Sequence, residues 1–226
     1  MAILRGLIFG DIFAIGGLDD RTRELITVIV LTVNQTLPQL RSHVGAALNV
    51  GVTPLELREA LYTCATFIGF PRTLNALAVA NEVFRSRGIE VPLPDAGTVG
   101  PDERLERGRE HQAPLYGTNM AAGLADVPDG LGAELARLLT ECGFGDFYTR
   151  SGLDLPTREL LVLVILAALG DTPVQIASHG LGNLKLGTSK ATLVAAMIHA
   201  FPYMGFPRAV NAVRILKDLP DEVASA

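Results

Sequence analysis

Four residues in the second half of the chain have the chemistry needed to move protons. They are Glu159, His179, His199 and Tyr203. His199 and Tyr203 are four positions apart, so on a helix they project from one face. A carboxylate, two imidazoles and a phenol that share one cavity can act as general acids and bases, and we predict that these residues are catalytic. A structural interpretation also fits each of them, because a glutamate at a helix start can be a cap and a histidine can bond a carbonyl.

Two arginines are candidates for holding a substrate carboxylate. Arg208 follows a Gly-Phe-Pro turn at a predicted helix start, where its guanidinium and free backbone N–H groups can bind an anion together. Arg158 directly precedes Glu159. The alternative is structural, with both arginines pairing with carboxylates such as Glu159 or with aspartates across an interface.

The pattern around these residues occurs twice, at Phe144 to Asn211 and at Phe9 to Asn75. A repeat of this length indicates a tandem duplication. The first copy holds equivalents of three site residues, namely Glu24, His43 and Arg72. His199 and Tyr203, however, correspond to Thr63 and Phe67. We therefore predict that the second copy carries the more complete site.

The elements that position these residues are predicted to be helices only. Capping residues and prolines indicate helix starts, and glycines indicate helix ends. The predicted helices are Arg21 to Val33, Pro38 to Gly51, Pro54 to Gly69, Pro71 to Gly88, Asp102 to His111, Leu131 to Cys142, Thr157 to Leu169, Pro173 to Leu186 and Ser189 onward. The expected organisation is a first repeat at 1–90, a Pro- and Gly-rich linker at 91–101 and a second repeat at 102–226. The helices between residue 101 and Phe144 are expected to have no counterpart ahead of Phe9.

Composition excludes several classes of partner. The net charge is −5 and the pI is near 5.4, which disfavours binding to nucleic acid or to an anionic membrane surface. No apolar run is long enough for a membrane span. The two cysteines, Cys64 and Cys142, fit a reduced cytoplasmic protein without a disulfide framework. A metal site is not expected, since no His-x-x-x-His or Glu-x-x-His pattern occurs.

The motifs together resemble the carboxymuconolactone decarboxylase family, within the alkylhydroperoxidase D-like superfamily. The resemblance rests on five stretches, namely Glu103 to Gly108, Phe144 to Leu160, Ala168 to Gly170, His179 to Gly187 and His199 to Asn211. It implies an all-α fold, no cofactor and a cavity for a small carboxylate or lactone. The resemblance also implies a homo-oligomer, which for a tandem chain would be a trimer forming a pseudo-hexameric ring.

The reaction that the resemblance implies is decarboxylation of a carboxylated unsaturated lactone. Tyr203 or protonated His179 would stabilise the dienolate, His199 would act as the acid, Glu159 would orient a histidine and Arg208 would hold the carboxylate. Peroxidase activity is disfavoured, because the residue three positions after Cys64 is Phe67 and a Cys-x-x-Cys motif is absent. Two alternatives are a tailoring enzyme acting on another lactone or polyketide-like substrate, and a non-catalytic small-molecule-binding or assembly protein.

Overall fold

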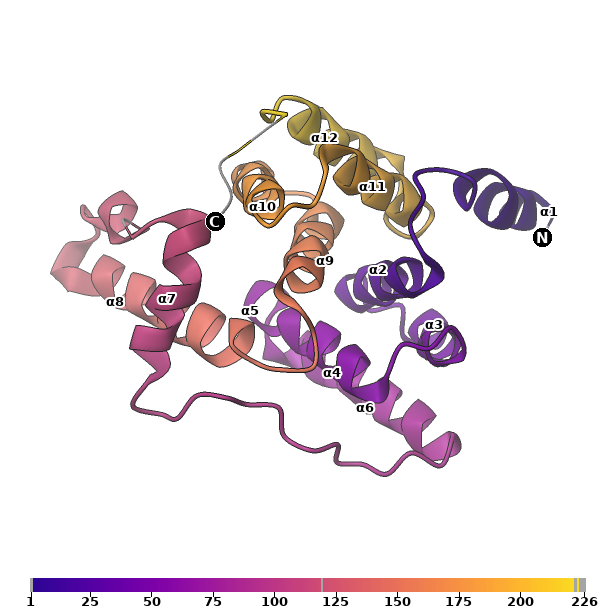
Figure 1. Ribbon diagram of the computed structural model, residues 1–226, viewed down its shortest axis with the longest axis horizontal. Coiled ribbons are helices and arrows are strands. Elements are labelled where there is room, and N and C mark those ends of the chain that lie inside the picture. Colours follow the sequence, from indigo (N-terminus) through magenta and orange to yellow (C-terminus); the bar gives the residue numbers. More distant parts are fainter. Residues whose placement is uncertain (1, 119, 222, 224–226) are drawn as a thin grey trace.

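The computed structural model describes residues 2–118, 120–221 and 223, and within those residues the chain is helical and has no strand (Figure 1). This confirms the predicted all-α class. No helix in this part of the chain is long and apolar enough to cross a bilayer. The elements are α1 (Ala2–Arg5), η1 (Gly6–Ile12), α2 (Asp20–Val33), α3 (Leu37–Asn49), α4 (Pro54–Thr63), α5 (Ala65–Ile68), α6 (Phe70–Ser86), α7 (Arg104–Tyr116), η2 (Met120–Leu124), η3 (Pro128–Gly130), α8 (Leu131–Leu138), η4 (Leu139–Tyr148), α9 (Leu155–Leu169), α10 (Pro173–Lys185), α11 (Lys190–Met204) and α12 (Phe206–Lys217).

Short polar side chains start the helices that carry the candidate residues. Asp19 accepts a hydrogen bond from the Thr22 amide at 2.8 Å, and Asp154 accepts one from the Thr157 amide at 2.8 Å. Thr53 and Glu56 form a capping box at the start of α4. These caps fix where α2 and α9 begin, and therefore the positions of Glu24 and Glu159 one turn later.

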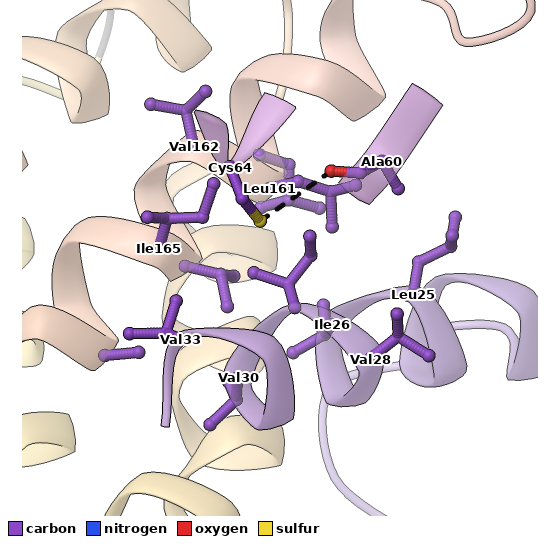
Figure 2. Close-up of a cluster of buried hydrophobic side chains, with 14 of the residues drawn as sticks. Leu25, Ile26, Val28, Val30, Val33, Ala60, Cys64, Leu161, Val162 and Ile165 are labelled. Atoms are coloured by element: carbon purple, nitrogen blue, oxygen red, sulfur yellow. Dashed lines mark hydrogen bonds between the residues drawn. The ribbon is translucent and has the colours of Figure 1, made fainter. Parts of the chain in front are cut away.

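Helices α2 and α9, which are equivalent in the two copies, pack against each other at the centre of the molecule (Figure 1). Figure 2 shows Ile26 and Val33 of α2 together with Leu161 and Ile165 of α9 in the apolar core, and Cys64, the residue that follows α4, lies among them. Both copies contribute to this one continuous core. The copies are therefore interlocked rather than separately packed.

Helix α7 lies along η4, and two glycines allow the close approach. A Cβ on Gly108 would lie 2.3 Å from the Thr140 carbonyl oxygen, and a Cβ on Gly145 would lie 2.3 Å from that of Arg104. Arg104 also pairs with Asp146, its Nε donating at 2.7 Å. This contact fixes α7 over the second copy.

The helices around this contact differ from the sequence-based expectation in two respects. The helix expected to end near His111 continues to Tyr116. The helix expected to end near Cys142 is followed by η4, which runs on to Tyr148. In addition, η1 is the first-copy equivalent of η4, so the expectation that the helices before Phe144 have no counterpart was wrong for η4.

The segment between α6 and α7 contains no helix and runs along one side of the molecule (Figure 1). It is held by contacts to both copies. Arg58 donates to the carbonyls of Leu93 and Pro94, and Thr98 donates to the carbonyl of Thr149 at 2.8 Å. The segment is thus a packed connection rather than a free tether.

Candidate active site

The carboxylate of Glu159, on the first turns of α9, is fully buried and receives three polar contacts. The hydroxyl of Tyr148 donates to Oε2 at 2.5 Å, and the hydroxyl of Tyr116 donates to Oε1. Nδ1 of His179 lies 2.7 Å from Oε1. A buried carboxylate requires such donors, since burying it without them is costly. Glu159 is therefore held in one orientation from three sides.

His179 is positioned by its Nδ1 atom and by its helix. Nδ1 faces Glu159 and lies 2.7 Å from the Tyr116 hydroxyl. The side chain of Asn183, one turn further along α10, donates to the backbone carbonyls of Glu159 and His179 at 3.0 and 2.9 Å. These bonds hold α10 against α9. Among the described residues, Nε2 of His179 has no hydrogen-bond partner, so this nitrogen is available to a substrate.

Tyr116 reaches the site because α7 crosses over it. The Tyr116 ring packs against His179 and Phe144, with centroid distances of 4.9 and 5.6 Å. On the opposite side, Gly182 leaves room for the hydroxyl, since a Cβ there would lie 2.8 Å from both that oxygen and Oε1 of Glu159. The packing of α7 therefore determines the hydrogen bonding of the carboxylate.

Burial and charge both act on the two phenols. Burial raises the pKa of Tyr116, and the neighbouring Glu159 carboxylate raises it further. The same two causes, in the same order, raise the pKa of Tyr148. Both hydroxyls therefore stay protonated at neutral pH and act as hydrogen-bond donors.

A cavity of about 330 Å³ adjoins this cluster. Its size lies in the range of small-molecule sites. The walls combine aromatic rings with a few polar side chains, and none of them is lysine or arginine. The lining residues are Thr66, Phe67, Tyr116, Leu139, Gly143, Phe144, Tyr148, Val174, Gln175, Ser178 and His179.

Each histidine of the repeated pattern packs against an aromatic ring from the other copy. Phe67 of the first copy lies edge-on to His179, with the centroids 5.8 Å apart. Tyr203 of the second copy lies edge-on to His43 at 5.5 Å. The four predicted catalytic residues consequently do not form one cluster. Glu159 and His179 lie at the cavity, whereas Tyr203 lies at the first copy's histidine.

The first copy's pair, Glu24 and His43, repeats the carboxylate-to-imidazole contact at 2.9 Å. Its surroundings differ. The position of Tyr148 is taken by Phe13, and no helix equivalent to α7 covers it in the described residues. The side chains of Glu24 and His43 are 15 and 25% exposed, against 0 and 13% for Glu159 and His179. This pair is more open and lacks the phenol donors.

His199 lies against the first copy, away from the cavity. Its Nε2 donates to the carbonyl of Arg23 at 2.9 Å, and Thr27 Oγ1 lies 3.1 Å from the same nitrogen. Nδ1 then accepts from the Arg23 guanidinium at 3.3 Å. Burial, followed by the Arg23 charge, lowers the pKa of His199 to about 4. A 1% exposed, neutral imidazole in this setting joins α11 to α2.

The predicted substrate-binding arginines are also at contacts between the copies. Arg158 is fully buried and donates to Thr63 Oγ1 at 2.9 Å, which mirrors the contact of Arg23 with His199. Arg208 donates to Asn34 Oδ1 at 3.0 Å. Arg72, the first-copy equivalent of Arg208, is exposed. The structure brings none of the three arginines to the Glu159 cavity.

Sequence reasoning missed the two tyrosines that hold Glu159. Tyr148 lies 11 positions before Glu159, at the end of the Phe-Gly-Asp-Phe-Tyr stretch. Its first-copy equivalent is Phe13, so comparison of the two copies does not mark the hydroxyl as a shared polar group. Tyr116 lies beyond the predicted end of its helix. Cys64 is fully buried, and burial raises the pKa of its thiol. In the described part of the chain, no group of three or more His, Cys, Asp or Glu side chains is arranged to hold a metal ion.

The chain is similar to several known proteins and matches one protein family. The chain is 37% identical over 81 residues to the 4-carboxymuconolactone decarboxylase of Acinetobacter baylyi, which covers 36% of this chain and 60% of that protein. It is 32% identical over 74 residues to the nitrosuccinic acid decarboxylase npaB of Metarhizium robertsii, covering 33 and 52% respectively. An alignment at 24% identity with peroxisomal protein 2 of Schizosaccharomyces pombe covers more of both proteins, 62% of this chain and 65% of that one. The matches thus span between half and two thirds of these relatives.

The carboxymuconolactone decarboxylase family profile matches residues 1–82 and 133–218, one segment for each copy. The matched segments include both Glu–His pairs and exclude α7. The match covers well over half of the chain, so the chain belongs to the carboxymuconolactone decarboxylase family.

Proposed function

We propose that this protein is a cofactor-free decarboxylase that acts on a small carboxylated unsaturated lactone at the Glu159–His179 site. The observation that carries the proposal is the buried Glu159 carboxylate, held by Tyr116, Tyr148 and His179 at the edge of a cavity of about 330 Å³. Relatives named as decarboxylases support the reaction class. The first copy's pair then serves mainly to build the shared core.

The reaction requires that a carbon–carbon bond break and that its electron pair move into the conjugated carbonyl as carbon dioxide leaves. The resulting dienolate carries a negative charge on oxygen, which a positioned donor stabilises. His179 in its protonated form can donate from Nε2 to this oxygen or deliver the proton to carbon. Glu159 fixes the ring and balances its positive charge.

This proposal changes the role predicted for two residues, His199 and Tyr203. His199 is replaced as the acid by His179, because His199 is buried and already bonded at both nitrogens. Tyr116, whose hydroxyl contacts Nδ1 of His179, takes the place of Tyr203 as the phenol of the site. The remaining polar groups of the cavity, including Gln175 and Ser178, would orient the substrate.

A second candidate function is proton transfer on an uncharged lactone or polyketide-like compound. The absence of lysine and arginine from the described cavity lining favours it, because a dianionic substrate would find no fixed positive charge there. The same His179 and Glu159 would then act as the base that moves a proton between carbons.

Assays with three substrates separate these functions. The purified protein is mixed, in the presence of a chelator, with 4-carboxymuconolactone, with nitrosuccinate and with an uncharged unsaturated lactone. Release of carbon dioxide from either acid supports decarboxylation, and exchange of solvent deuterium into the uncharged lactone supports the second candidate. No reaction with all three would contradict both.

A further inference from the structure

The last turn of α7 carries Tyr116 to the Glu159 carboxylate, and a lysine of α10 holds this turn in place. Nζ of Lys185 donates to the carbonyl of Leu115 at 2.6 Å and to that of Pro114 at 3.3 Å. These two residues directly precede Tyr116 in the chain. We infer that Lys185 is a positioning residue of the site, and that it acts by fixing the Tyr116 hydroxyl against the Glu–His pair.

The end of α7 needs hydrogen-bond donors from outside the helix. The last carbonyls of an α-helix have no donor within it. The amide of Gly117 bonds the carbonyl of Ala113 at 2.9 Å, and Lys185 bonds the next two carbonyls. Pro114 lies inside the helix and has no N–H, so α7 also has one internal hydrogen bond fewer near its end. The last turn is therefore held largely by contacts with α10.

The charge of Lys185 is directed at the same place. Among the described residues this lysine forms no ion pair, and both of its hydrogen bonds go to carbonyls of α7. The C-terminus of a helix carries a partial negative charge, so an ammonium group is favourable there. Lys185 therefore stabilises the end of α7 both as a donor and as a cation.

Helix α10 presents three residues to α7 at intervals of three positions. The ring of His179 packs against that of Tyr116, with centroids 4.9 Å apart. Gly182 leaves room for the Tyr116 hydroxyl, and Lys185 binds the backbone just before it. Residues three apart lie on neighbouring turns of one side of a helix. Both the side chain and the backbone of this part of α7 are thus fixed to α10.

The first copy provides an internal comparison. His179 and His43 are 136 positions apart, and by the same spacing the equivalent of Lys185 is Asn49. Asn49 accepts a hydrogen bond from Arg87 of its own copy at 2.8 Å. Within the described residues, no helix covers the first copy's Glu–His pair. The lysine thus occurs in the copy that has a covering helix to hold.

Ionisation of the Tyr116 phenol reports its position without an enzyme assay. Burial, and then the Glu159 carboxylate, raise the pKa of Tyr116 well above the ordinary value. A phenol released into solvent ionises near pH 10. The chain has four tyrosines and no tryptophan, so the ultraviolet absorbance of tyrosinate counts the ionised phenols. The measurement is a titration of the folded protein to about pH 11, with circular dichroism as the check on folding.

Lys185→Met, which keeps an apolar stem without the donor, should add the absorbance of one tyrosinate. The addition should be absent when Tyr116→Phe is combined with it. Lys185→Arg retains charge and N–H donors and should titrate as the wild type. The matched control is Lys190→Met, because Lys190 donates to the carbonyl of Leu219 at 2.5 Å, beyond the end of α12. No added tyrosinate in Lys185→Met, or the same addition in Lys190→Met, would overturn the inference.

Turnover gives a second test, as a double-mutant cycle. Lys185→Met should lower kcat about tenfold through the displaced hydroxyl, and Lys185→Arg should restore most of it. In the Tyr116→Phe background, Lys185→Met should change kcat by less than about twofold, because no hydroxyl is left to position. An equal fold-change in both backgrounds would overturn the inference, since Lys185 would then act independently of Tyr116.

The two measurements separate the role of Lys185 from the reaction. Its effect on turnover rests on the proposed function of the site, whereas its effect on the phenol does not. Release of the Tyr116 phenol in a protein without decarboxylase activity would support the positioning role and contradict only the proposed reaction. Turnover by the wild type, with no release of the phenol in Lys185→Met, would contradict only the positioning role.

Discussion

Phe67 and His179 belong to different copies of the repeat, yet their rings meet edge to face with centroids 5.8 Å apart. Tyr203 and His43 repeat this relationship with the copies exchanged. Each Glu–His pair therefore has an aromatic neighbour from the other copy. The sites have diverged, because only the Glu159 site has two phenols and a covering helix.

Tyr148→Phe should lower both stability and activity. The change leaves Oε2 of the buried Glu159 without its donor at 2.5 Å. The expected loss is about 1–3 kcal/mol in the free energy of unfolding, measured by urea denaturation. Phenylalanine fits such a position, as Phe13 does in the first copy, so the fold should persist. Tyr62→Phe, away from Glu159, is the control, and an equal loss in both variants would contradict the role of Tyr148.

Gly182→Ala should reduce turnover without unfolding the protein. The new methyl group would lie 2.8 Å from the Tyr116 hydroxyl and from Oε1 of Glu159, so one of them must move. Alanine is favoured over glycine in a helix by about 1 kcal/mol, which offsets part of the steric cost. The control variant is Gly10→Ala, because a methyl group at that position would have no other atom within 4 Å. Unchanged turnover in Gly182→Ala would show that the position of Tyr116 does not matter.

His199 should make stability sensitive to acid. Its pKa of about 4 in the folded protein lies below the ordinary value of 6.5, so the unfolded chain binds the proton more readily. The stabilisation from the neutral ring is complete above about pH 6.5 and is lost as the pH falls toward about 4. Between about pH 7 and about pH 5 the loss should be about 2 kcal/mol.

The matched variant for this prediction is His199→Gln, which keeps polar atoms and cannot titrate. Its free energy of unfolding should change less than that of the wild type between the two pH values. The measurement is urea denaturation at each pH. Parallel pH dependence in the two proteins would show that His199 is not the titrating group.

The predicted trimer can be tested at the exposed face of α8. Leu131, Leu135 and Leu138 lie on one side of this helix and are 60, 57 and 49% exposed. A contiguous apolar stripe on a surface helix is typical of an interface. Light scattering should give a mass of three chains for the wild type and a smaller one for Leu135→Glu. A monomer at all concentrations would contradict the prediction.

The sequence predicted the parts of the structure that depend on local interactions. Asp19, Thr53, Asp154 and Ser189 lie within three residues of the predicted helix starts, and each accepts a capping hydrogen bond. The sequence placed Glu159 and His179 on successive helices. The repeat identified Glu24 and His43 as their first-copy equivalents.

What the sequence did not reveal depends on contacts between distant segments. Periodicity shows which face of a helix is apolar but not which helix covers it, so Tyr203 was assigned to the histidine of its own copy. A helix was expected to end near Cys142. Instead, Gly145 allows α7 to approach η4. The same approach brings Tyr116 to Glu159, and nothing local to Tyr116 indicates it.

We expect turnover to depend on the Glu159 carboxylate and not on its first-copy equivalent, Glu24. The direct measurement is carbon dioxide release from 4-carboxymuconolactone by the wild type, Glu159→Gln and Glu24→Gln, with thermal unfolding of each as the check on folding. We predict that Glu159→Gln lowers kcat/KM by about 100-fold or more, the size expected for loss of acid–base positioning, while Glu24→Gln stays within about threefold of the wild type. Full activity in Glu159→Gln, or loss of activity in Glu24→Gln alone, would show that the Glu159 carboxylate is not required for turnover.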